Sequence, residues 1–283
     1  MPRRAAAVEF VLLTRAFKRR AWPCPWPAVW AESGHMAPDT ADSRALVRAL
    51  RQALQAQAQP QQAPAMRAYM KSAMPFLGIA TPQRRRTVAE VAAVHPLAES
   101  NGLVDAVLDL WRGATHREER YAALDLLRLA RLRKHIDLAL LPALHEMLLT
   151  GPWWDHNDEI SGHALGLLLQ RHPGTLKPLL RTWAGGDSLW LRRAAMLSQR
   201  SLKTGFDAVL LYDCILPSLG DPRFEREFFI RKGIGWALRE RSYAAPDEVI
   251  AFCQEYAARL SPLTKREALK VLIKRGLYLS GTR

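Results

Sequence analysis

The sequence predicts an all-α protein built from stacked helical hairpins. From Thr40 onward, apolar residues recur at the three- and four-residue spacing of helices, and the valine, isoleucine or threonine runs typical of strands are absent. Glycine and proline interrupt this pattern at short intervals, as connections between helices do. Similar segments also recur at helical-hairpin length, which favours a solenoid of HEAT-like repeats with a concave basic groove.

The first three predicted helices have recognisable ends. Asp42 or Ser43 can cap a helix over residues 42–57, and a glutamine-rich linker separates it from a second helix over residues 64–74. Thr81 is the expected cap of a third helix over residues 81–94, with Pro82 in its first turn. Ten further helices are expected at about residues 101–112, 117–132, 136–149, 153–171, 175–184, 188–202, 207–217, 224–241, 247–259 and 264–278.

Five of these helices carry a small residue in a similar setting. The residues are Ala123, Gly162, Ala194, Gly233 and Ala268, at successive spacings of 39, 32, 39 and 35 residues. A small residue lets neighbouring helices approach closely, and the second helices of successive repeats line one concave face. Basic residues adjoin these positions and would form a stripe suited to a phosphate backbone, although a charged stripe is also common on any solvated helix face. They are Arg117, Arg120, Arg192, Arg193, Arg231, Lys232, Lys265 and Arg266.

Composition narrows the class of partner. The chain has 283 residues and a formal net charge of +14, which favours a polyanionic partner, with nucleic acid ahead of an anionic membrane. The three cysteines and eight histidines show no metal-ligand spacing, so no metal is expected. The scattered cysteines indicate a reducing compartment, and no apolar run reaches membrane-spanning length.

The first 40 residues are expected to lie outside the repeat domain, which spans residues 41–283. The first 35 residues are basic, with six arginines and lysines against two glutamates, and a segment rich in proline and tryptophan follows the last arginine. A secretory signal is improbable because the apolar stretch is short and contains Glu9. The alternatives are an organellar presequence, an unstructured extension, or upstream sequence before a true start at Met36.

One stretch stands out as a candidate site. Residues 151–161 place two tryptophans and three carboxylates at the start of a helix. Trp154 and Asp158 stand four residues apart and therefore share a face. Trp153, Asp155 and Glu159 have ordinary explanations as core or as acids that complement the helix dipole. Asp158 lies beyond the first turn of a helix in a basic protein, so it is the candidate functional carboxylate.

Two further tryptophans lie beside basic residues on similar helices. Trp190 precedes Arg193, and Trp236 follows Lys232. Tryptophans that recur beside cations suggest a groove for sugar and phosphate with flat surfaces for stacking or cation–π contact, although each one alone could be a core residue.

From about Ala41 to about Gly276 the chain resembles the AlkD family of DNA alkylation repair glycosylases, which are HEAT-like solenoids. The resemblance implies that Asp158 is the catalytic carboxylate, that Trp154 and Trp236 are aromatic walls around the lesion nucleotide, and that Arg193 clamps a phosphate. At His156 and Asn157 the chain departs from that family's usual pair of a small hydroxyl residue and an apolar residue. The resemblance is carried by Tyr69-Met70-Lys71, residues 76–82, residues 153–158, residues 190–195, residues 228–236 and residues 265–268.

These observations favour a DNA N-glycosylase for cationic N3- or N7-alkylated purines in duplex DNA, such as 3-methyladenine and 7-methylguanine. No cofactor or metal is expected, and the protein is expected to act as a monomer in the cytoplasm, at the nucleoid. The expected DNA contacts are Arg193, Trp190, Arg192, Arg231, Lys232, Lys265, Arg266 and Tyr69. Two alternatives are a non-catalytic HEAT-repeat nucleic-acid-binding protein and a protein–protein scaffold.

Overall fold

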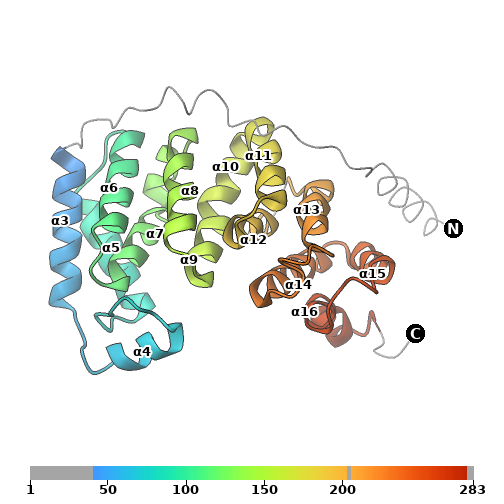
Figure 1. Cartoon of the computed structure of the whole chain (residues 1–283). Helices are drawn as coiled ribbons and strands as arrows, with labels where there is room; N and C mark the ends of the chain where they lie inside the picture. The colour runs from blue at the N-terminus through green and yellow to red at the C-terminus, as the bar shows by residue number, and fades with distance from the viewer. Residues whose placement is uncertain (1–40, 203–204, 279–283) are drawn as a thin grey trace. The chain divides into compact units, whose positions relative to one another are not determined.

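The computed structural model describes residues 41–202 and 205–278, and every regular element within them is helical. The all-α fold class is therefore confirmed. The described helices form two compact units, here called the N-terminal unit, up to Pro173, and the C-terminal unit, from Gly174 onward (Figure 1). The expected extension over residues 1–40 lies outside the described residues.

The N-terminal unit is a row of α-helices with short 3-10 connections. In Figure 1 the axes of α3, α6 and α8 run in nearly the same direction, and α4 lies apart from that row. Its elements are α3 (Ala41–Ala56), α4 (Ala63–Met70), α5 (Thr81–Val94), α6 (Ser100–Arg112), α7 (Arg117–Leu126), η1 (Ala130–His135), η2 (Leu138–Leu140), α8 (Leu141–Thr150), α9 (Trp154–Glu159), η3 (Ile160–Leu165) and α10 (Gly166–Arg171).

The C-terminal unit continues the same architecture. Helix α14 packs against both α12 and α16, so helices of successive predicted repeats are neighbours here. Its elements are α11 (Pro173–Gly185), α12 (Leu189–Leu197), α13 (Ala208–Ile215), η4 (Leu216–Ser218), α14 (Phe228–Ser242), α15 (Pro246–Glu255) and α16 (Pro262–Lys274).

The five small residues of the predicted repeat are all buried. Ala123 lies in α7, Ala194 in α12 and Ala268 in α16, each with no exposed surface, and the two glycines are buried in η3 and α14. At Gly233 an added Cβ would stand only 3.1 Å from a guanidinium nitrogen of Arg193. The close approach expected of this position is therefore present between α12 and α14.

Several predicted helices are shorter than expected. The helix expected over 117–132 ends at Leu126, because Leu129 is extended and a 3-10 segment follows. The helix expected over 64–74 ends at Met70, because Lys71 adopts the left-handed conformation. Thr81 is not the cap of α5: Ala80 occupies that position in an extended conformation. The helix expected from residue 224 begins only at Phe228, and the one expected to reach residue 202 ends at Leu197.

A buried carboxylate fixes the loop that leads into α5. Glu118 is fully buried, and its carboxylate accepts hydrogen bonds from the backbone N–H groups of Leu77, Gly78 and Ile79 at 2.9, 2.9 and 3.2 Å. Gly78 has φ +87°, and an added Cβ would lie 2.1 Å from the Gln59 carbonyl oxygen, so only glycine fits there. This loop is thereby held against the start of α7.

Candidate functional site

The candidate carboxylate lies next to an irregular helical turn. Asp158 is in α9 and is only 8% exposed, while Trp154, one turn earlier, is half-buried. Directly after α9 the helix widens into a π-helix at η3, where the Ser161 hydroxyl donates to the Asn157 carbonyl oxygen at 2.5 Å. Such π-turns are rare and are frequent at functional sites. The sequence predicted one continuous helix here and gave no sign of this turn.

The histidine that departs from the family pattern is a buried packing residue. His156 is 1% exposed, and its ring makes edge contacts with Trp111 and Tyr121 at centroid distances of 4.8 and 5.6 Å. Its Nδ1 lies 3.2 Å from the Gly151 carbonyl oxygen, and because that oxygen can only accept, Nδ1 donates. Burial is the main cause that lowers the pKa of His156 to about 4, so the ring is neutral at pH 7. Through this hydrogen bond and these ring contacts, the buried His156 side chain fixes the start of α9.

A buried ion pair joins α7 to α9. Arg117 donates to both carboxylate oxygens of Asp155 at 2.8 and 3.0 Å, and its Nε donates to the Tyr121 hydroxyl at 2.8 Å. That hydroxyl donates in turn to Asp155 at 2.5 Å, and burial followed by the Asp155 charge raises the pKa of Tyr121. Asp155 thus has the structural role expected of it, and Arg117 is neutralised by it.

In the C-terminal unit, Arg193 links α12 to α14. It is 4% exposed and donates to the Phe229 carbonyl oxygen at 2.6 Å. Trp190, one turn earlier and half-buried, packs its ring against that of Phe229 at a centroid distance of 5.2 Å. Because Gly233 has no side chain, there is room for the Arg193 guanidinium beside it.

Trp236 lies between two cations on a half-buried surface. The Arg200 guanidinium stands over its ring at 4.5 Å and that of Arg239 at 6.0 Å, while its indole N–H donates to Glu240 at 2.8 Å. The flat ring is thus held in a fixed orientation. Neither Arg200 nor Glu240 was a sequence candidate. Glu240 lies four residues after Trp236, which helical spacing could have suggested, whereas Arg200 comes from the segment after α12.

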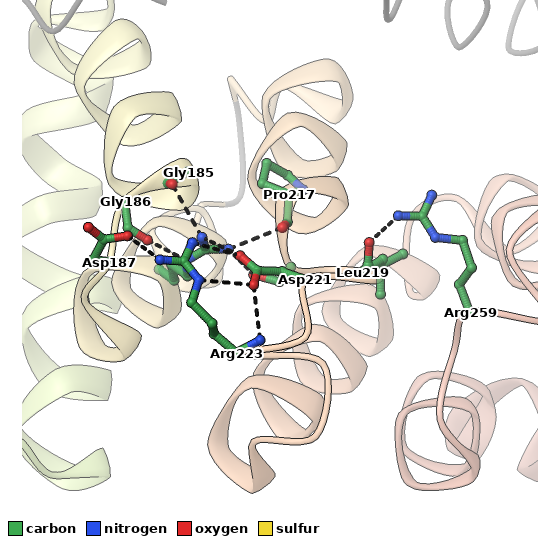
Figure 2. A network of polar contacts seen from close by, with 10 residues as sticks. Gly185, Gly186, Asp187, Pro217, Leu219, Asp221, Arg223 and Arg259 are labelled. Atoms are coloured by element: carbon green, nitrogen blue, oxygen red, sulfur yellow. Dashed lines mark hydrogen bonds and ion pairs between the residues drawn. The ribbon is translucent and has the colours of Figure 1, made fainter. Parts of the chain in front are cut away.

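Arg192 has a different environment from that of its neighbour. It is 1% exposed, and its guanidinium donates to the carbonyl oxygens of Gly185, Gly186 and Pro217, to the Ser218 hydroxyl and to Asp221, at 2.6 to 3.2 Å. Figure 2 shows these groups converging, with Arg223 bridging Asp221 and Asp187. The guanidinium also lies 4.0 Å over the Phe224 ring. This is the environment of a structural arginine that joins three segments, not of a side chain that meets a phosphate.

The other sequence candidates vary in exposure. Lys232 pairs with Glu267 at 2.8 Å, and Glu267 also binds Arg239. Arg231 and Lys265 are half-buried, Arg266 is exposed, and Tyr69 on α4 is 77% exposed. Tyr69, Trp154 and Asp158 belong to the N-terminal unit and the remaining candidates to the C-terminal unit. That they share one concave surface stays a prediction.

No group of three or more histidine, cysteine, aspartate or glutamate side chains in the part of the chain that the structure describes could hold a metal ion. None of the helices in residues 41–202 and 205–278 has both the length and the apolar character needed to cross a membrane.

Comparison with known proteins identifies the family. A family model described as "DNA alkylation repair enzyme" matches residues 50–272. The chain belongs to this family. A solved structure entitled "Predicted DNA alkylation repair enzyme from Enterococcus faecalis" is similar at 29% identity and a TM-score of 0.67, over 77% of this chain and 98% of that one. No curated protein matches the chain.

For this member of the DNA alkylation repair family, the sequence pointed to the candidate carboxylate and tryptophans, whose roles stay a prediction, but not to the residues that pack around them. Tyr121 and Glu118 lie in α7, which packs against α9, and were not singled out, because a tyrosine and a glutamate on a helix carry no distinctive pattern. Arg120 was identified only as one residue of a basic stripe, although its guanidinium lies over the Trp111 ring.

Proposed function

We propose that this protein is a DNA N-glycosylase that hydrolyses the N-glycosidic bond of cationic N3- or N7-alkylated purines, such as 3-methyladenine and 7-methylguanine, in duplex DNA. The supporting observation is a nearly buried carboxylate, Asp158, one helical turn after a half-buried tryptophan, in a chain of the DNA alkylation repair family. The chain's charge of +14 suits a duplex as the substrate.

The chemistry of the substrate explains why so few groups are needed. Alkylation at N3 or N7 makes the purine cationic, so the base is a good leaving group without acid catalysis. What remains is to stabilise the positive charge that develops on the deoxyribose and to supply water. An ionised carboxylate near the anomeric carbon does both, and tryptophan faces add cation–π stabilisation.

In this proposal Asp158 is the catalytic carboxylate, and Trp154 and Trp236 are walls around the lesion nucleotide. Arg193 contacts a backbone phosphate. Trp190, Arg231, Lys232, Lys265, Arg266 and Tyr69 contribute further DNA contacts. We assign Arg192 a structural role because its guanidinium is surrounded by five protein acceptors, one of them the Asp221 carboxylate. The protein acts as a monomer without cofactor or metal, in the cytoplasm at the nucleoid.

The test compares two neighbouring carboxylates. Asp158→Asn keeps the size of the side chain and removes its charge, so excision of 7-methylguanine should fall on the order of a hundredfold or more while DNA binding persists. Glu159→Gln is the matched control, because Glu159 lies next in the chain and pairs with Arg85 and Arg128. It should excise normally.

The measurement is release of methylated bases from duplex DNA, identified by chromatography and corrected for spontaneous loss. If Asp158→Asn excised the base as fast as the parent protein, the catalytic assignment would fail. If neither the parent protein nor any variant released bases but all bound DNA, a non-catalytic binding protein would be the correct function.

A further inference from the structure

A pocket of about 610 Å³ lies in the N-terminal unit, and neither Trp154 nor Asp158 lines it. Its wall is formed by the segment after α4, the start of α7 and the segment before α9, including Lys71, Met74, Arg117, Arg120, Trp153 and His156. The volume falls within the roughly 300–1,000 Å³ of small-molecule sites. None of its lining residues, all of them in the described part of the chain, is an aspartate or a glutamate.

Arg120 brings to this pocket a cation that has no carboxylate partner in the part of the chain that the structure describes. Its guanidinium lies 4.7 Å over the Trp111 ring and donates one hydrogen bond, to the Thr150 carbonyl oxygen at 3.3 Å. Its Nε is buried and has no partner among the described residues. Burial, followed by repulsion from Arg117, lowers the pKa of Arg120. The side chain is thus held in place by packing while its charge remains uncompensated, which favours an anion.

The two other cations of the wall differ in availability. Arg117 is committed to Asp155 and Tyr121. Lys71 is exposed and stands at the end of α4 in the left-handed conformation, with φ 48°, a conformation that lysine rarely adopts. The Arg117 backbone N–H donates to the Pro75 carbonyl oxygen at 2.9 Å, which ties the segment after Lys71 to α7. Lys71 and Arg120 are therefore the cations that a bound anion would meet.

A second buried polar atom of this wall also lacks a partner. His156 is 1% exposed, and its Nδ1 donates to the Gly151 carbonyl oxygen. Its Nε2 has no hydrogen-bond partner among residues 41–202 and 205–278. In the neutral ring this nitrogen is an acceptor. Buried polar atoms of native proteins are nearly always satisfied, so two unsatisfied ones in one pocket wall point to a ligand. Trp153 and Met74 add flat and apolar surface to the same wall.

We propose that this pocket binds a nucleotide, with the phosphate on Arg120 and Lys71 and the base against the surface formed by Trp153 and Met74. A cationic end beside an aromatic and apolar wall matches the two halves of a nucleoside monophosphate. The nucleotide is either an unpaired residue of a DNA strand or a free mononucleotide. The inference is independent of the proposed excision chemistry, because Asp158 does not line the pocket.

Calorimetric titration with deoxyadenosine 5′-monophosphate tests the proposal. The parent protein and Asp158→Asn should bind it equally, and Arg120→Gln should weaken binding at least about tenfold, as expected for loss of a charge-assisted contact. Arg131→Gln is the matched control, an exposed arginine of η1 that does not line the pocket, and should bind normally. Deoxyadenosine and inorganic phosphate should each bind at least about tenfold more weakly than the nucleotide.

Lys71→Gly keeps the test valid should Arg120→Gln fold poorly. Glycine adopts the backbone conformation at this position without strain, so the substitution removes the cation and leaves the fold intact. It should weaken nucleotide binding several-fold. Lys71→Arg should restore it, which a purely structural role of the residue would not explain.

Competition with duplex DNA distinguishes the two sources of the nucleotide. If the mononucleotide displaces DNA from the parent protein but not from Arg120→Gln, the pocket takes a nucleotide of the strand. If it binds without displacing DNA, the ligand is a free nucleotide. The proposal is overturned if the nucleotide does not bind at millimolar concentration, or if Arg120→Gln and Lys71→Gly bind it as well as the parent protein. Equal affinity for inorganic phosphate would overturn the assignment of the base.

Discussion

Arg192→Met should destabilise the C-terminal unit strongly without changing the salt dependence of DNA binding. The substitution keeps an unbranched side chain of similar length over Phe224 and removes every hydrogen bond of the guanidinium. It therefore separates the structural role that the contacts indicate from the DNA contact that the charge pattern alone suggested.

The size of the expected loss in the free energy of unfolding follows from the hydrogen bonds that Arg192 makes. Asp221 keeps Arg223 at 3.1 Å and is 15% exposed, so it does not become an uncompensated buried charge. The three backbone carbonyl oxygens and the Ser218 hydroxyl lose a charged donor, and hydrogen bonds to charged groups contribute about 1.5–3 kcal/mol each. Because water can reach part of this site, we expect a total loss of about 3–5 kcal/mol in the free energy of unfolding. Arg192→Lys should lose nearly as much, because an ammonium cannot reproduce the planar fork.

Two assays check this prediction. Urea unfolding followed by circular dichroism at pH 7 measures stability. Anisotropy of a labelled duplex over a salt series, well below the unfolding midpoint, measures the salt slope of binding. Arg193→Met is the comparison and should reduce that slope by about one. The reasoning is refuted if Arg192→Met unfolds like the parent protein, or if it reduces the slope as Arg193→Met does.

Two further predictions concern buried groups of the N-terminal unit. Glu118→Gln replaces one acceptor oxygen facing the Leu77–Ile79 backbone by an amide donor, so the free energy of unfolding should fall by about 2–4 kcal/mol in urea; an unchanged value would contradict the role of Glu118. Because the pKa of His156 is lowered from 6.5 to about 4, the unfolded chain binds a proton first as pH falls, and stability should decrease between those values by on the order of 3 kcal/mol. His156→Gln should lose less stability than the parent protein from pH 7 to 4, and parallel curves would speak against the assignment.

The helices and the position of the carboxylate could be predicted from the sequence, because both depend on local patterns. Apolar spacing and the glycine and proline stops located the helices, and some of them, such as α6 and α13, to within about two residues at both ends. Helix ends were less accurate where tertiary contacts decide them. Helix α4 ends at Met70 because Lys71 adopts the left-handed backbone conformation, which the presence of a lysine does not predict. The π-turn after Asp158 had no counterpart in the apolar pattern, which predicted one continuous helix there.

The roles of the arginines could not be predicted, because the sequence shows charge but not which charges are already neutralised. Arg192 and Arg193 are adjacent in sequence, yet Arg192 meets acceptors from residues 185–186, in the preceding turn of chain, and from residues 217–221, which lie 25 to 29 residues away. Arg117 and Arg120 lie one turn apart on α7, and of the two only Arg117 pairs with Asp155 of α9.

This difference also bears on where a polyanion binds. A paired cation contributes little to the potential outside the protein, since its partner cancels its field over a few ångströms. Of the predicted stripe, Arg117, Arg192 and Lys232 each have a carboxylate partner. The net positive charge of the described part of the chain is therefore carried by other cations. One of them is Arg120, which is half-buried against an aromatic ring. A cation held rigidly by packing loses little entropy on meeting a phosphate, so Arg120 is better suited to specific anion recognition than a flexible surface lysine.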